Sequence, residues 1–174
     1  MREAVSNGGT LLIPAFAVER TQELLVDLID LMERGGIPAV PVLPDSPLAI
    51  RASSVFRKHF ESLRPEINLE RVMQSPYLRC TETVNQSKAL SRVSGGYIVI
   101  AGSGMCDAGR IRHHLRQCLW HKNASLLLVD FQAKGTLGRF LTDGARAVRI
   151  FGTGHAGIVL AVRSASCRRR GCSC

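Results

Sequence analysis

A pattern that occurs three times constrains this chain most strongly: a short apolar run, a turn of small residues, and a helical pattern that begins near an arginine. The apolar runs lie at 10–15 (TLLIPA), 97–101 (YIVIA) and 125–129 (SLLLV). Short uncharged runs of this kind are typical of strands that are buried on both faces. Strands that alternate with helices predict an α/β fold, namely a doubly wound, mostly parallel sheet with helices on both faces.

The other predicted elements fit the same architecture. We expect helices at 20–34, 46–63, 81–91, 108–119 and 136–141, and further strands at 39–43 and 147–151. Prolines at 38, 41 and 44 favour an edge position for the strand at 39–43, because proline has no N–H to donate to a neighbouring strand. Asp107 stands where it would cap the helix at 108–119.

The length of 174 residues and the hydrophobic content of 45% suit one compact domain. We predict an α/β domain at 1–152, followed at 153–174 by an irregular, basic, cysteine-rich tail that resembles an out-of-frame or truncated end. The sequence has neither a long apolar run nor a signal-peptide pattern, so we expect no membrane association and a location in the cytoplasm.

The charge balance favours a polyanionic partner. Lys and Arg number 23 against 14 Asp and Glu. Four of those arginines, at 163, 168, 169 and 170, lie in the tail without any acidic residue beside them, so the body of the chain is only mildly basic. The position of the remaining basic residues therefore matters more than their number.

One arginine follows each of the three repeated turns: Arg20, Arg110 and Arg139. Strand ends and helix N-termini meet at the carboxyl edge of a parallel sheet, where ligands bind. A guanidinium beside free backbone N–H groups suits phosphate oxygens, so we predict that these arginines bind the backbone of a nucleic acid. The alternative is that each one caps a helix or forms a local salt bridge.

Other polar residues lie in or near the same turns. Ser103, Gln132 and Thr136 could donate hydrogen bonds to a sugar-phosphate backbone, although ordinary turn chemistry explains them equally well. His113 and His114 point in different directions from one helix and do not form a metal site together. A packed His114 and Cys118 is the simpler interpretation. One of the two histidines could still face the phosphate groove, and His114 is our candidate for RNA binding. For Asp45 we favour a capping role over a position in the crevice.

The glycine-rich turn GSGMCDAG does not have the spacing of a dinucleotide or ATP site.

Four segments closely resemble the β-CASP domain of metallo-β-lactamase-fold nucleases that process RNA. In chain order they are GGTLLIPAFAVERTQELL, PVLPDSPLA, SGMCDAGRIRHHL and LLLVDFQAKGTLGRFL. The resemblance covers about residues 7–152. It implies a cap domain inserted into a metallo-β-lactamase scaffold, with RNA in the cleft between them, and it assigns groove-lining positions to Arg20, Ser103, Arg110, Thr136 and Arg139.

The resemblance also implies two zinc ions, which the scaffold would hold. The family's H-x-H-x-D-H motif lies upstream of the matched segment, so we expect no metal ligands and no cofactor in this chain, and no catalysis by this chain alone. The family continues to an S-x-H-A element, for which His155 is a candidate if a deletion has brought it forward; a truncated end is the favoured alternative.

Two hypotheses follow from these observations. The first is an RNA-binding cap domain of a zinc-dependent endoribonuclease, represented here without its metal site. The endonuclease activity is implied by the family resemblance alone. The second is a nucleic-acid or protein-interaction module that stands alone and has no catalytic role. A nucleotide-binding enzyme is a weaker third possibility.

Overall fold

The computed structural model describes residues 1–6, 8–59, 69–80, 96–145, 147–151, 153–155 and 162–164, the last two ranges by their backbone only. The predicted helix at 81–91 and most of the predicted tail at 153–174 lie outside these ranges. No described helix is long and apolar enough to cross a membrane.

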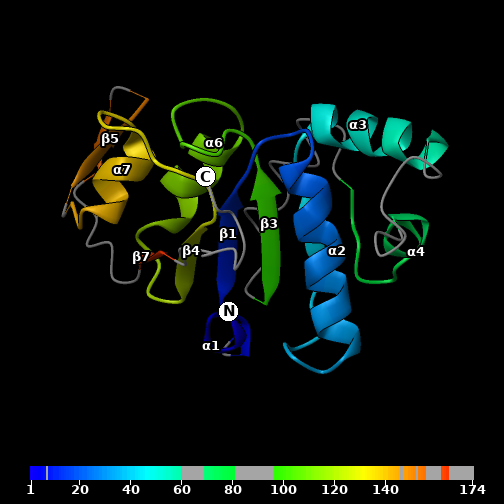
Figure 1. Ribbon diagram of the computed structural model, residues 1–174. Helices are drawn as coiled ribbons and strands as arrows, with labels where there is room; N and C mark the ends of the chain where they lie inside the picture. Colours follow the sequence, from blue (N-terminus) through cyan, green and yellow to red (C-terminus); the bar gives the residue numbers. More distant parts are fainter. Residues whose placement is uncertain are drawn as a thin grey trace, which may run out of the picture.

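A five-stranded sheet forms the centre of the molecule (Figure 1). Its strands, in the spatial order β2-β3-β1-β4-β7, are β2 Val42–Pro44, β3 Tyr97–Ala101, β1 Thr10–Pro14, β4 Ala124–Leu128 and β7 Val162–Ser164. Every neighbouring pair is parallel. The prediction of a doubly wound parallel sheet is therefore confirmed, as is the edge position of the strand next to the prolines.

Helices cover both faces of this sheet. Helices α1 Arg2–Ser6, α2 Arg20–Glu33 and α4 Leu69–Met73 contribute to one core cluster, whereas α6 Ile111–Cys118 and α7 Leu137–Thr142 contribute to the other. Helix α3 Pro47–Lys58 packs beside α2 and α4. The alternation of side chains along a strand explains the division: Leu11 and Ile13 belong to the first cluster, and Leu12 between them belongs to the second.

Two capping predictions need correction. Ser46, not Asp45, is the N-cap of α3, and its side chain accepts a hydrogen bond from the Ala49 N–H at 3.2 Å. Asp107 does not cap α6, which begins only at Ile111 after an N-cap at Arg110. The Asp107 carboxylate instead accepts from the Leu137 N–H at 2.8 Å, which is at the start of α7. The physical reason is that the glycine-rich turn after β3 reaches the start of α7, which follows β4, before α6 starts.

The segment predicted as a strand at 147–151 is extended, but it lies outside the central sheet. Strand β5 Val148–Ile150 pairs antiparallel with β6 Thr153–His155 in a separate two-stranded sheet. Thus six residues of the segment for which the sequence predicts irregular structure form short strands, β6 and β7. Strand β7 also extends the central sheet by pairing with β4.

Candidate nucleic-acid interface

The three predicted arginines follow three adjacent strands. Strands β3, β1 and β4 are parallel neighbours, so their carboxyl ends lie at the same edge of the sheet (Figure 1). Arg20 is the first residue of α2, Arg110 is the N-cap of α6, and Arg139 lies in the first turn of α7. The backbone arrangement at this edge is therefore the one that the repeated sequence pattern indicates.

Carboxylates pair with Arg20 on two sides. Its Nε donates to Asp130 at 2.8 Å, and its Nη1 donates to Glu23 at 2.7 Å. A hollow of about 340 Å³ beside it is also lined by Glu19. One guanidinium thus faces three carboxylates, which makes this part of the edge locally acidic.

Arg110 belongs to a buried cluster that the sequence did not reveal. Its Nη1 donates to one oxygen of Asp45 at 2.6 Å, and the Nε2 of His114 lies 2.7 Å from the other oxygen. Asp45 is 0% exposed and His114 is 3% exposed. Asp45 is the first residue after β2. Because Ser46 caps α3, the Asp45 carboxylate is available to contact Arg110 and His114. His114 thus contacts a buried carboxylate, and its predicted contact with RNA stays a prediction.

Arg139 has a different environment. Its Nε donates to both carboxylate oxygens of Asp143 at 2.9 Å, one helical turn further along α7. The side chains are 40% and 55% exposed, so water surrounds this pair. An exposed ion pair has little net strength, and another anion can replace its carboxylate.

The predicted polar residues all take part in turns. Ser103 Oγ accepts from the Ala108 N–H at 3.3 Å, and Thr136 Oγ1 accepts from the Arg139 N–H at 3.2 Å as the N-cap of α7. The buried Gln132 amide donates to the carbonyls of Gly104 and Asp130 at 3.0 and 2.9 Å. These contacts fix the strand-to-helix turns, which is the alternative that the sequence left open.

The acidic partners connect neighbouring strand exits. Arg110 after β3 reaches Asp45 after β2, and Arg20 after β1 reaches Asp130 after β4. Both carboxylates immediately follow the apolar run of a strand, and this position is the signal in the sequence that could have identified them. The partners themselves lie 65 and 110 residues apart in the chain, so no local pattern pairs them.

The described residues do not fit a metal centre. No group of three or more His, Cys, Asp or Glu among them is arranged to hold a metal ion. The side chain of His155 is outside the described part of the chain, so its predicted role stays a prediction. Burial raises the pKa of the Cys106 thiol to about 12 and that of the Cys118 thiol to about 11, which keeps both protonated near neutral pH.

A doubly wound sheet that carries arginines at its carboxyl edge defines an α/β domain suited to anionic ligands. Residues 21–141 match the model of the Beta-Casp domain, and the chain belongs to that family. It is 37% identical to the ribonuclease TTHA0252 of Thermus thermophilus over 87% of this chain and 36% of that protein. It is 32% identical to an RNase J-like protein of Methanocaldococcus jannaschii, over 86% of this chain and 34% of that protein.

A third relative is the transcription termination factor FttA of Cenarchaeum symbiosum, with 30% identity over 87% of this chain and 24% of that protein. The chain therefore spans about a third or less of the length of these relatives. Their names assign ribonuclease and transcription-termination activities to proteins considerably longer than this chain.

Proposed function

We propose that this chain is the RNA-binding cap domain of a metallo-β-lactamase-fold nuclease, and that RNA lies along the carboxyl edge of its parallel sheet. The observation that carries the proposal is the placement of Arg20, Arg110 and Arg139 after three adjacent parallel strands. Membership of the Beta-Casp family and the ribonuclease names of its relatives support RNA as the polyanion.

The three arginines contribute differently under this proposal. Arg139 exchanges its exposed partner Asp143 for a phosphate, because the existing pair is surrounded by water. Arg110 keeps Asp45, which is fully buried and fixes the plane of the guanidinium before RNA arrives. Arg20 contributes least, because its surroundings are acidic.

Salt-dependent binding of a single-stranded RNA, followed by fluorescence anisotropy, tests this proposal. Phosphate binding predicts an affinity that falls steeply with salt. Arg139→Ala and Arg110→Ala should each weaken binding to all RNA sequences alike and reduce the salt slope by about one. Arg34→Ala is the matched control, since Arg34 follows the far end of α2 and forms a comparable pair with Asp30. Binding that does not respond to salt contradicts the proposal.

Cleavage of the phosphodiester is assigned to a scaffold domain, because the described residues offer no metal centre. We expect no zinc-dependent RNA cleavage by the chain alone and cleavage once a metallo-β-lactamase scaffold from a relative is joined to it. Cleavage by neither protein, with RNA binding intact, would favour a binding module without catalysis.

A further inference from the structure

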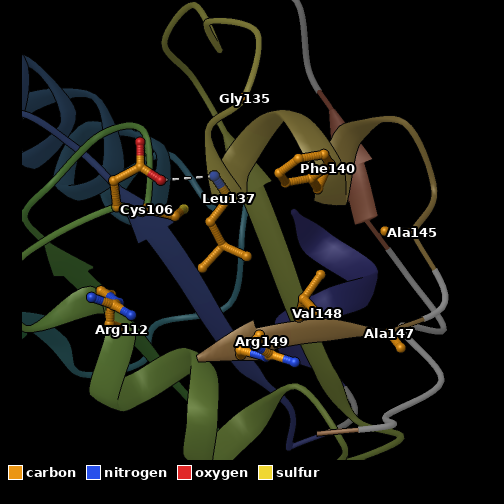
Figure 2. A pocket seen from close by; sticks show the side chains of 10 residues that line it. Cys106, Arg112, Gly135, Leu137, Phe140, Ala145, Ala147, Val148 and Arg149 are labelled. Atoms are coloured by element: carbon orange, nitrogen blue, oxygen red, sulfur yellow. Dashed lines mark hydrogen bonds between the residues drawn. The ribbon is translucent and has the colours of Figure 1, made fainter. Parts of the chain in front are cut away.

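A second hollow, on the α6 and α7 side of the sheet, combines cationic and apolar walls. It has a volume of about 410 Å³ and is lined by Arg112 of α6, by Leu137 and Phe140 of α7, and by Val148 and Arg149 of β5 (Figure 2). Ligand sites for small organic groups have this size and this mixture of apolar surface with a few polar groups. The hollow therefore suits a ligand with an apolar ring and an anionic group.

The charge of this hollow differs from that beside Arg20. Its lining residues include two arginines, Arg112 and Arg149, and one acidic residue, Asp107. The Asp107 carboxylate already accepts a hydrogen bond from the Leu137 N–H. The hollow is thus net positive and attracts an anion, in contrast to the hollow with one arginine and three carboxylates.

Arg112 carries an unsatisfied donor. Its Nε is buried and has no hydrogen-bond partner in the described structure, while its guanidinium lies 4.4 Å from the centre of the Phe151 ring. A buried N–H without an acceptor destabilises the protein, and a guanidinium group suits the oxygens of a phosphate. Stacking on Phe151 holds the guanidinium plane in place at the hollow.

An aromatic surface is available beside these cations. Phe140 lines the hollow and is 51% exposed, so its ring is accessible to a ligand. Aromatic side chains next to arginines are the means by which proteins hold unpaired bases of single-stranded nucleic acid. The ring of Phe140 therefore supplies the stacking partner that a base requires.

The hollow also continues the edge where RNA is proposed to lie. Arg112 follows Arg110 by two residues on α6, and Phe140 follows Arg139 directly on α7. We expect a strand of RNA that contacts Arg139 to pass close to Phe140, the next residue of α7.

We propose that this hollow binds one nucleotide of a single-stranded RNA, with the base against Phe140 and the phosphate on Arg112 and Arg149. This inference rests on the proposed function, because it assumes that RNA follows the sheet edge. It adds a contact to a base, whereas the arginines at the strand exits contact only the backbone.

Two probes separate the base contact from the backbone contacts: a single-stranded oligoribonucleotide, and an abasic oligomer with the same number of phosphates. Phe140→Ala should weaken binding of the first by about fivefold or more and leave binding of the second unchanged. Arg112→Ala should weaken binding of both, as should Arg110→Ala. Phe140→Leu keeps an apolar side chain and serves as a second variant if Phe140→Ala fails to fold.

Matched control residues lie on α6 and just after it. Arg116 is an exposed arginine of α6 outside the hollow, and Trp120 is an exposed aromatic residue just beyond the end of α6. Arg116→Ala and Trp120→Ala should leave both affinities within twofold of the unmodified chain, as is usual for contacts outside a binding site.

Each outcome decides between the two proposals. If the unmodified chain binds RNA with the expected salt dependence and both Phe140 variants bind normally, the nucleotide site is overturned and the proposed function stands. If the chain binds neither probe, both proposals fail. If a base-dependent loss is found in Trp120→Ala instead, the bases stack elsewhere and the hollow is not their site.

Discussion

Carboxylates fix the directions of the arginines at the sheet edge. The turns supply Arg20, Arg110 and Arg139, but Asp130, Asp45 and Asp143 hold their guanidinium groups. These pairs differ in exposure from a fully buried Asp45 to a half-exposed Asp143. The same residue type therefore has a structural role at one position and an exchangeable partner at another.

Asp45→Ala should destabilise the chain strongly. The substitution leaves Arg110 and the buried His114 without their shared carboxylate, and the loss of one partner from a buried pair costs about 3–5 kcal/mol. Urea unfolding followed by circular dichroism measures the change in the free energy of unfolding.

Asp143→Ala is the control for this measurement, because its ion pair with Arg139 is exposed and contributes about 0–1 kcal/mol. Equal losses in the two variants would show that burial does not determine the strength of these pairs.

The two buried thiols make stability depend on alkaline pH. The unfolded chain deprotonates cysteine near the ordinary pKa of 9.0, whereas the folded chain retains the proton until a pKa of about 12 at Cys106 and about 11 at Cys118. Stability is thus complete below pH 9 and falls as pH rises towards 11 and 12, because the unfolded state binds fewer protons there. Each thiol should shift the folding equilibrium by up to about tenfold per pH unit.

Unfolding in urea at pH 8, 9 and 10 measures this dependence. Cys106→Ser is a suitable comparison, because a hydroxyl does not ionise in this range and its variant should show a weaker loss. A pH dependence identical in the variant and in the unmodified chain would exclude Cys106 as a source.

The sequence predicted which residues stand at the edge but not what they contact. Arg20, Arg110 and Arg139 are found by local reasoning, because each follows its strand by a short turn. The sequence favours Asp45 as the cap of α3, but Ser46, one position later, has the same capping chemistry and is the N-cap in the structure. Choosing between two adjacent cap residues requires the position of α6, which comes from a distant segment.

Elements with strong apolar patterns were the most predictable. The strands expected at 10–15, 97–101 and 125–129 are present as β1, β3 and β4 with small changes at their ends. The strand near the prolines begins at Val42 and not at 39, since the preceding prolines cannot donate to a ladder. The strand at 147–151 shows the limit of such patterns, because an apolar run does not specify which sheet it joins.

Close packing of α7 against the turn after β4 requires a glycine at 138. A Cβ there would overlap the Gln132 side-chain oxygen and would lie 3.1 Å from the Met105 carbonyl oxygen. Gln132 cannot easily move away, because its amide donates to the Gly104 and Asp130 carbonyls. We expect Gly138→Ala to reduce stability by about 1–3 kcal/mol, as overpacking usually does.

A double-mutant cycle with Gln132→Ala checks this cause. Removing the glutamine should relieve most of the cost of Gly138→Ala, so the two changes should be non-additive by about 1 kcal/mol or more. Strict additivity would show that the alanine clashes with the Met105 backbone and not with the glutamine.

At the scale of the whole molecule, the fifth strand connects a distant segment to the sheet. Strand β7 pairs with β4 from Leu126↔Val162 to Leu128↔Ser164, although the sequence predicts that the domain ends at 152. Its partner β4 is a fully apolar strand at its carboxyl end. The boundary at 152 stays a prediction, and the pairing provides a direct test of it.

A chain that ends at residue 152 should have an exposed β4 edge. Backbone groups that lose their partner strand exchange faster with solvent and favour edge-to-edge association. We expect faster amide hydrogen exchange at Leu126 to Leu128 and more aggregation in light scattering than for the full chain. Unchanged exchange at these amides would support a domain that is complete at 152.

The buried Asp45 cluster has an evolutionary consequence. One carboxylate serves both a guanidinium and an imidazole, so the loss of Asp45 removes the shared partner of Arg110 and of the buried His114 at once. Across related genes, positions 45, 110 and 114 should therefore be replaced together, and a lineage that lost the acid at 45 should also have exchanged its two basic neighbours for uncharged residues.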